Sequence, residues 1–298
     1  MELHQLTKHC YWSDPVSYGD RPSLGLIAGV EATLAVDTGN GPGHGLWLLR
    51  EAERLGLPPV RWAALTHWHW DHIMGGRAMQ EAGVSLICTR GTGEQLRVLS
   101  EYQWTHEAIA RRVEEGLEIP FCQKGIREEY PDEPRALDPP LPDLEIEGPI
   151  TIDLEGVTVR LLPQPSDHSP DGLLVHCPED KVVFSGDSLS PNMYVAPWHY
   201  TRELFLPFLD ALRGLEADWY FHSHMEKPLT GEEFHRFFQD QRRLSWAAGE
   251  DMTMGAPLAR LAERLGREPD EEEKKGLSFH VNGNLMRGRL GVAGRPWP

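Results

Sequence analysis

The chain has 298 residues, enough for one large domain or two smaller ones, and 40% of them are apolar. A formal charge of −17, without a run of lysine or arginine, argues against nucleic acid or an anionic membrane as the main partner. No stretch approaches the roughly twenty apolar residues that span a bilayer, and the first residues lack the apolar core of a secretory signal. We therefore expect a small molecule as the partner.

The four cysteines are far apart in the sequence and form no Cys-x-x-Cys pair. They are Cys10, Cys88, Cys122 and Cys177. This pattern predicts reduced, buried thiols and a cytoplasmic location.

In the first third of the chain, short apolar runs alternate with segments of helical spacing. The predicted elements are a hairpin at 24–36, a helix at 44–55, a strand at 62–65, a helix at 76–81 and a strand at 84–88. The next section differs, because 94–112 has helical character and 119–149 is rich in proline and acidic residues. We interpret about 94–149 as an insertion. It is either a solvated surface excursion or a lid or wall of a substrate site, since long irregular loops often serve active sites.

A second block rich in strands follows the insertion. Strands are predicted at 150–153, 158–162, 173–177, 182–185 and 219–222, and helices at 203–215, 231–245, 256–265 and about 270–277. Two strand blocks, each with helices, predict an α/β chain (α+β by some schemes) with two sheets packed face to face and covered outside. We expect one domain over 1–245 and a small helical extension over 246–298 packed on it.

The segment 66–72 reads Thr-His-Trp-His-Trp-Asp-His and follows the predicted strand at 62–65. Residues two apart on an extended chain project to the same side, so His67 and His69 can face one ion. A turn into the next helix then brings Asp71 and His72 to a second position nearby. Imidazole and carboxylate groups suit zinc, iron or manganese. The alternative is a set of capping and surface histidines, and four ligand types at one corner argue against it.

Three further ligand candidates lie at predicted strand ends. His168 lies in a turn between two strands, Asp187 follows the strand at 182–185, and His224 follows the strand at 219–222. Loops at one edge of a sandwich can hold such side chains together on a rigid scaffold.

His-x-His-x-Asp-His, a later turn histidine, a Gly-Asp after an apolar strand and a final histidine, in that order, resemble the metallo-β-lactamase superfamily. The upstream Asp37-Thr38-Gly39 also resembles the early aspartate motif of that family. The resemblance covers roughly residues 20–235, and the tract from Ser185 to His224 is most similar to poorly characterised bacterial hydrolases. It implies the αββα sandwich fold.

The resemblance also implies the role of each ligand. It assigns His67, His69 and His168 to a first metal, Asp71, His72 and His224 to a second, Asp187 to the bridge between them, and Asp37 to orienting the ligands by hydrogen bonds. Two departures stand out. Ser166-Asp167-His168 replaces the usual Pro-Gly-His. His222 and His224 are both candidates for the last ligand, and we choose His224 because it matches the motif.

This ligand set predicts two divalent transition metals, zinc first, with iron or manganese as alternatives. We predict a hydrolase in which a metal-bridging hydroxide attacks an ester, lactone, thioester or phosphoester. Asp71 is predicted to orient the nucleophile or shuttle a proton. The resemblance favours hydrolysis, because position 187 is a carboxylate. It disfavours electron transfer to oxygen, because the flavodiiron branch has glutamate at the position of His69. The alternatives are a mononuclear iron sulfur (persulfide) dioxygenase, a nuclease, and a binding scaffold without catalysis.

Aromatic residues near the motifs are the candidates for a substrate pocket. The loop after Asp187 contains the four predicted pocket residues, which are Tyr194, Trp198, His199 and Tyr200; Trp104 and His106 in the insertion are weaker candidates. Trp68 and Trp70 alternate with the ligand histidines, so we predict that they pack in the core rather than contact substrate.

Overall fold

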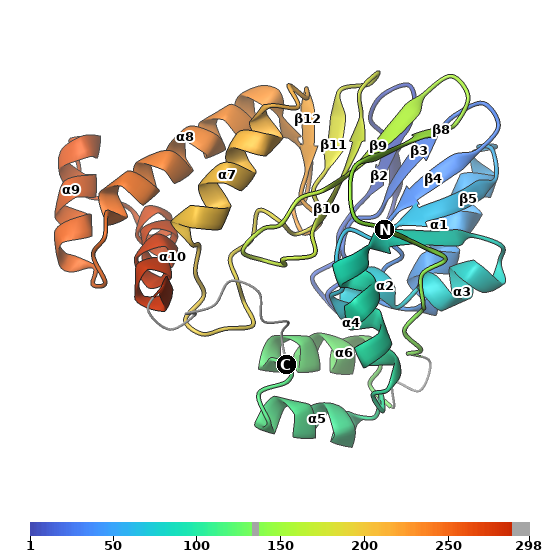
Figure 1. The fold of residues 1–298 in the computed structure, drawn as a ribbon, viewed down its shortest axis with the longest axis horizontal. Coiled ribbons are helices and arrows are strands. Elements are labelled where there is room, and N and C mark those ends of the chain that lie inside the picture. The colour runs from blue at the N-terminus through green and yellow to red at the C-terminus, as the bar shows by residue number, and fades with distance from the viewer. Residues whose placement is uncertain (133–136, 288–298) are drawn as a thin grey trace.

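The computed structural model describes residues 1–132 and 137–287. Two sheets pack face to face, and helices cover the outer side of each (Figure 1). This is the predicted αββα sandwich. Among the described residues, no helix combines the length and apolar character needed to cross a bilayer.

The first sheet has seven strands in sequence order. They are β1 (Leu3–Gln5), β2 (Cys10–Ser13), β3 (Gly25–Ala28), β4 (Thr33–Val36), β5 (Val60–Ala64), β6 (Ser85–Thr89) and β7 (Leu144–Ile146). β1 to β4 pair antiparallel, and β4 to β7 pair parallel. The parallel pairing places the carboxyl ends of β4, β5 and β6 at one edge of the sheet.

The second sheet has the order β13-β12-β11-β10-β9-β8. Its strands are β8 (Ile150–Asp153), β9 (Thr158–Pro163), β10 (Leu173–Cys177), β11 (Val182–Phe184), β12 (Trp219–Phe221) and β13 (Leu229–Thr230). β11 and β12 are parallel, so the loops that follow them leave the sheet at the same edge. The other neighbouring pairs are antiparallel.

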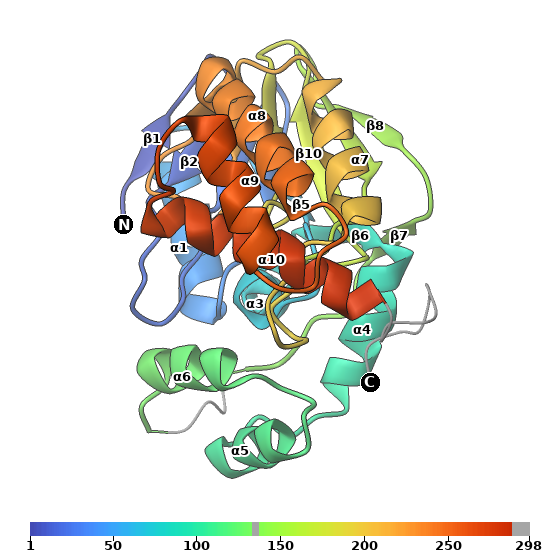
Figure 2. The same cartoon turned by 90° about the vertical axis from the view of Figure 1, so that its left-hand side faces the viewer.

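Helices follow both strand blocks. On the first sheet these are α1 (Pro42–Arg54), α2 (Trp70–Ile73), α3 (Gly76–Glu81) and α4 (Arg90–Ser100); the insertion adds α5 (His106–Glu114) and α6 (Pro120–Glu129). The second block has α7 (Arg202–Arg213), α8 (Gly231–Ala248), α9 (Gly255–Leu265) and α10 (Glu271–Arg287). α5 and α6 project from one end of the sandwich, while α9 and α10 pack against α8 (Figures 1 and 2).

Three buried clusters of apolar side chains hold these layers together. The middle one lies between the sheets, with Leu34 and Val36 of the first sheet against Val175 and Phe184 of the second. A second fills the space between the first sheet and its helices, and a third lies under α7 and α8. Each sheet therefore buries both faces, as near-continuous apolar strands such as β4 require.

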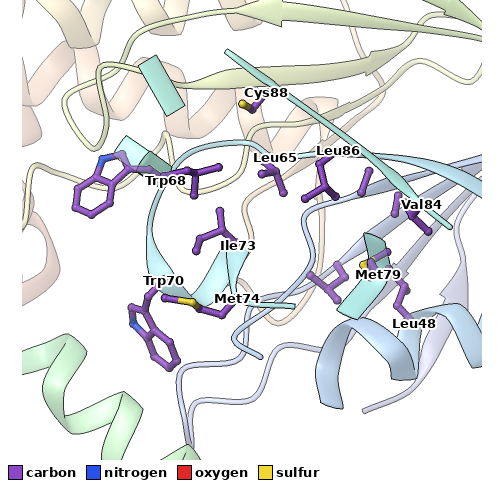
Figure 3. Close-up of a cluster of buried hydrophobic side chains, with 14 of the residues drawn as sticks. Leu48, Leu65, Trp68, Trp70, Ile73, Met74, Met79, Val84, Leu86 and Cys88 are labelled. Carbon is purple, nitrogen blue, oxygen red and sulfur yellow. The ribbon is translucent and has the colours of Figure 1, made fainter. Parts of the chain in front are cut away.

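Trp68 and Trp70 lie in the cluster beneath the first sheet, near Leu65, Ile73 and Met74 (Figure 3). Both indoles are buried. Core packing, as predicted for the two tryptophans, is confirmed.

Several boundaries differ from the predictions. The helical region at 94–112 is two helices, α4 and α5, separated at Tyr102-Gln103-Trp104. The acidic stretch at 119–149 contains α6, and it also contains β7, which extends the first sheet and is not predicted. α8 runs across the predicted boundary at 245, and α10 continues ten residues beyond its predicted end.

Candidate metal centre

The change of backbone at residue 70 separates the four side chains of the histidine motif into two pairs. β5 ends at Ala64, and the chain stays extended through His69, which has φ −60° and ψ 144°. α2 begins at Trp70 and carries Asp71 and His72. His67 and His69 therefore leave an extended segment, as the sequence predicts. Asp71 and His72 leave the first turn of α2, so the predicted change of direction is present, but it begins in a helix that is not predicted.

The structure brings all seven predicted ligands together in two groups. One group contains His67, His69 and His168, and the other contains Asp71, His72, Asp187 and His224. Within each group the ligand atoms lie within 4.8 Å of one another. In a tetrahedral site with bonds of about 2.1 Å, ligand atoms stand roughly 3.4 Å apart, so both groups have the dimensions of a single ion's ligand shell.

Asp187 lies where the two groups meet. Its Oδ2 is 3.2 Å from Nε2 of His224 and 3.6 Å from Nε2 of His72, both in the second group. The same oxygen is 3.7 Å from Nε2 of His168 in the first group. One carboxylate thus reaches both groups, which is the position that a bridging ligand requires.

The chemistry of these atoms fits divalent metal ions. Nε2 of His67 and Oδ1 of Asp187 are buried and have no hydrogen-bond partner among the described residues. Leaving buried polar atoms unpaired costs about 1–3 kcal/mol each, and coordination would satisfy them. Burial also lowers the pKa of His67 and His69 well below the usual value, and that of His168 to about 4. These imidazoles are therefore neutral at pH 7, the form that binds metal.

The second group is strongly coupled by charge. Burial alone would lower the pKa of His72, but the carboxylates of Asp71, Asp37 and Asp187 raise it well above the usual value. The pKa of His224 is raised in the same way by Asp187 and Asp71. For Asp71, burial acts to raise the pKa, and the two histidines outweigh it and hold the pKa below the ordinary range. Asp71 is therefore ionised at neutral pH.

Asp37 contacts two residues of the histidine motif, Thr66 and His72. Its Oδ1 accepts a hydrogen bond from the backbone N–H of Thr66 at 2.7 Å, and its Oδ2 accepts one from the Thr66 hydroxyl at 2.8 Å. Nδ1 of His72 lies 2.8 Å from the same Oδ2. Asp37 reaches these groups from a left-handed backbone conformation, φ 61°, which is uncommon for a residue with a side chain and is typical of functional sites.

The second half of the chain supplies ligands from three loops. His168 is held by a contact of 3.2 Å between its Nδ1 and the carbonyl oxygen of Pro191. Asp187 and His224 follow the parallel strands β11 and β12 at the same edge. His222 also lies near Asp187, with its Nδ1 3.7 Å from Oδ1, but both ring nitrogens have other partners. Nδ1 lies 2.8 Å from the carbonyl oxygen of Gly186, Nε2 lies 3.1 Å from the Ser190 hydroxyl, and neither belongs to the two ligand groups. The geometry thus places His224, rather than His222, with the other ligands.

A cavity of about 500 Å³ opens above the two groups. Its floor is formed by His69, Asp71, His168, Asp187 and His224. Its walls come from α6 and the residue before it (Ile119, Phe121, Cys122, Lys124), from the segment between β2 and β3 (Pro15, Ser17, Asp20), and from Ser190, Met193, Tyr194 and Glu226. The insertion is predicted to be either a surface excursion or a lid or wall of a substrate site. For α6, the second interpretation is correct, because its residues form a wall of this cavity.

Of the four aromatic residues predicted to line the pocket, Tyr194 does so. Its ring centroid is 4.9 Å from that of His69 and 5.2 Å from that of Trp68. Its hydroxyl lies 3.5 Å from the sulfur of Cys122 on α6. Tyr194 therefore connects the histidine motif to the insertion.

The structure does not place Trp198, His199 and Tyr200 at this cavity. The Tyr200 hydroxyl donates to the carbonyl oxygen of Leu189, and its ring stacks on Phe205 beneath α7. Nδ1 of His199 lies 2.9 Å from the carbonyl oxygen of Pro197, and the backbone of Trp198 accepts from Asn282 of α10. Trp198 and Tyr200 thus contact α10 through their backbones, and none of the three residues lines the cavity, which is a correction to the prediction.

Trp104 and His106, the weaker candidates, do not line the cavity either. The guanidinium of Arg112 lies over the Trp104 ring at 4.9 Å, and the indole N–H donates to the carbonyl oxygen of Leu99. His106 begins α5. Their positions are those of packing residues within the insertion.

Sequence reasoning missed Asp20, which lines the cavity close to a predicted ligand. Its Oδ1 is 3.7 Å from Nδ1 of His224, and burial and the nearby Asp71 raise its pKa to about 7. Asp20 belongs to no motif and lies about two hundred residues from His224 in the chain. Its left-handed φ of 51° marks a constrained turn, which the preceding Gly19 alone does not signal.

The family model of the metallo-beta-lactamase superfamily matches residues 19–224. The match covers more than half of the chain and contains every residue of the two ligand groups. The chain therefore belongs to the metallo-beta-lactamase superfamily, and it carries the His and Asp cluster of a hydrolase of that superfamily.

Among curated proteins, a linear primary-alkylsulfatase from Pseudomonas sp. is 24% identical over 234 residues, which are 70% of this chain and 42% of that protein. The chain thus spans less than half the length of this relative. A metallo-beta-lactamase family protein from Thermus thermophilus has a similar fold, with a TM-score of 0.60, 20% identity and 98% of each chain covered. A stereoselective inverting sec-alkylsulfatase from Pseudomonas sp. has a TM-score of 0.64 at 18% identity, covering 98% of this chain and 50% of its own.

Proposed function

We propose that this chain is a dinuclear metallohydrolase that cleaves an ester, lactone, thioester or phosphoester in a small molecule. The observation that supports it is the shared carboxylate of Asp187, which reaches both ligand groups at the floor of a cavity. A binding scaffold without catalysis would not need seven converging ligands. We propose zinc as the first choice of metal, because nitrogen and carboxylate ligands in this number suit it.

The two ligand groups would hold two divalent ions, which would supply Lewis acidity for the hydrolysis. The protein contributes the surrounding groups. Asp71 is ionised, lines the cavity and lies 3.1 Å from Nε2 of His224, so it is placed to orient a water molecule by accepting a hydrogen bond from it. Asp20 lies behind His224 and, with its raised pKa, is a second place where a proton can reside near pH 7.

Sulfate monoesters form a second candidate substrate class. Two of the similar proteins named above are alkylsulfatases, although each shares under 25% identity with this chain. The same ligand set would serve sulfate and carboxylate esters, because divalent ions held there would withdraw negative charge from the oxygen atoms of either group. Both classes belong in one substrate panel.

The test is metal analysis of gently purified protein combined with a panel of p-nitrophenyl acetate, a lactone, a thioester, a phosphodiester and an alkyl sulfate. We expect about two metal ions per chain and turnover of at least one ester class. His69→Ala should lose metal and activity together, while His235→Ala, an exposed histidine of α8, should change neither. Protein that binds no transition metal would refute the proposal. One iron per chain with oxygen uptake on a persulfide would instead favour a sulfur dioxygenase.

A further inference from the structure

Two segments far apart in the chain face each other across the cavity. One wall is the segment 15–21 between β2 and β3, and the other is α6 with the residue before it. α6 lies at the end of the sandwich from which the insertion projects (Figure 2). The width of the cavity therefore depends on how these two segments are joined.

Arg21 and Glu129 join them by a two-pronged ion pair. Nε of Arg21 donates to Oε2 of Glu129 at 2.8 Å, and Nη2 donates to Oε1 at 2.7 Å. Paired guanidinium and carboxylate groups in this geometry fix orientation as well as distance. The Glu129 side chain is 14% exposed, so water screens the pair less than it would on an open surface. A further hydrogen bond runs from the backbone N–H of Gly19 to Glu128 at 3.2 Å.

The two walls also contact each other closely at Gly125. A Cβ at Gly125 of α6 would lie 3.0 Å from Cβ of Asp20 and 3.1 Å from the Trp70 ring. These separations are tighter than ordinary van der Waals contact, so a side chain at this position would require Asp20 or Trp70 to shift by a few tenths of an ångström. Close packing opposes inward movement, and the Arg21–Glu129 ion pair opposes outward movement.

Part of the cavity lining is apolar, unlike the residues of the two ligand groups. Pro15, Ile119, Phe121 and Met193 form this part, and Phe121 is 46% exposed. A phenylalanine left open in a cavity offers contact area that a bound apolar group can bury, at about 25 cal/mol per Å². The one lysine of the lining, Lys124, already lies 3.5 Å from Glu128.

We propose that the gap between segment 15–21 and α6 holds the apolar acyl or alkyl group of an ester substrate, and that the Arg21–Glu129 ion pair sets the width of this gap. This inference rests on the proposed hydrolase function for its substrate class. Phe121 is then a specificity residue that contacts the substrate, whereas Arg21 and Glu129 are positioning residues that act through α6.

Substrate selectivity tests the apolar contact. For p-nitrophenyl esters from acetate to octanoate, Phe121→Ala should lower the ratio of kcat/KM between octanoate and acetate about tenfold, mainly through KM, with the metal content unchanged. Arg21→Ala should reduce the same ratio, and the charge-reversed pair Arg21→Glu with Glu129→Arg should restore it. An unaltered ratio in Phe121→Ala would overturn the substrate assignment.

Two measurements do not depend on turnover. The first is hydrogen exchange of peptides covering 120–129, which should be at least tenfold faster in Arg21→Ala than in the wild type. Arg77→Ala, which breaks an ion pair to Asp138 away from the cavity, should leave that exchange unchanged. Unchanged exchange in Arg21→Ala would overturn the positioning role.

The second measurement uses the fluorescent probe 1-anilinonaphthalene-8-sulfonate, added to metal-loaded native protein. The probe should bind several-fold more weakly to Phe121→Ala than to the wild type. Equal binding to both proteins would overturn the apolar site. If the wild type binds metal and the probe but cleaves no ester, the proposed function fails. The two measurements still decide whether the gap binds an apolar group and whether the Arg21–Glu129 ion pair positions α6.

Discussion

Oδ2 of Asp37 lies 2.8 Å from Nδ1 of His72, and both side chains are almost completely buried. This contact leaves Nε2 of His72 directed at Asp71 and Asp187. A carboxylate behind a ligand histidine fixes the ring and raises its basicity. Because Asp37 also holds Thr66 by its N–H and its hydroxyl, one residue orients the start and the end of the histidine motif.

Asp37→Asn should therefore weaken metal binding without removing a ligand. The amide can accept at one position only, so either His72 or Thr66 loses its partner. We expect a rise of about 10- to 100-fold in the Kd for zinc, measured by competition with a chromophoric chelator. Asp210→Asn, an exposed aspartate of α7, is the matched control and should leave the Kd unchanged. Equal affinities in the two variants would show that Asp37 does not orient the ligands.

Asp187→Asn should have a larger effect, because Asp187 reaches both groups. The variant removes the shared negative charge, so we expect the metal content to fall from about two ions to one or fewer. Ester hydrolysis should fall at least 100-fold, about 2.7 kcal/mol of transition-state stabilisation. Metal analysis by mass spectrometry after dialysis gives the first result, and initial rates give the second. Retention of two ions would exclude Asp187 as the bridge.

Gly283→Ala should loosen the contact between α10 and the rest of the chain. A Cβ at Gly283 would overlap the backbone carbonyl of Tyr200, which cannot move as a side chain can. We expect a loss of about 1–3 kcal/mol in the free energy of unfolding, measured by denaturant titration. Gly255→Ala in α9 is the control, because its Cβ would meet no atom within 4 Å. That variant should be neutral or up to about 1 kcal/mol more stable.

His280 should make the protein sensitive to acid. Burial, with a smaller effect from Arg202, lowers its pKa to about 3, against about 6.5 in the unfolded chain. Between these values the unfolded state binds the proton and the folded state does not, so the stability that His280 contributes is fully present above pH 6.5 and falls as the pH falls toward 3. The slope is about 1.4 kcal/mol per pH unit at most.

His280→Gln keeps a donor for the Oε1 of Gln241, which His280 Nε2 contacts at 3.1 Å, and removes the titration. The variant should lose less stability than the wild type between about pH 6.5 and pH 4, while both show the same pH dependence above about pH 7. Chemical denaturation at several pH values measures this difference. Parallel stability curves over the whole range would contradict the assignment to His280.

The histidine motif is predictable from the sequence because it depends on local geometry. Alternation along an extended chain pairs His67 with His69, and a change of direction after them moves Asp71 and His72 to a second position. The structure makes this change with α2, a short helix that is not predicted from the sequence. The sheets are likewise predictable, since strands such as β4 and β11 are almost wholly apolar. His168, Asp187 and His224 can be found in the same way, because each lies in a loop next to a predicted strand.

The walls of the cavity are not predictable in the same way. α6 begins at Pro120, is only ten residues long and lies in a stretch rich in proline and acidic residues, which hides it from local patterns. Asp20 acquires its environment from α6 and from His224, which lie about one hundred and two hundred residues away. The loop after Asp187 turns toward α10 beyond Tyr194, because Asn282 and Phe279 provide partners there. Such contacts depend on tertiary packing, which local patterns do not encode.

The ligands come from both halves of the sandwich: four follow β5 of the first sheet, and three lie in loops of the second. Ions held between them would act as a cross-link that exists only when the sheets are docked in register. Metal affinity would then report on the interface between the sheets, and a substitution deep in that interface, such as Val175→Ala, should release metal although it touches no ligand. Chelators should correspondingly lower the temperature at which the two halves separate.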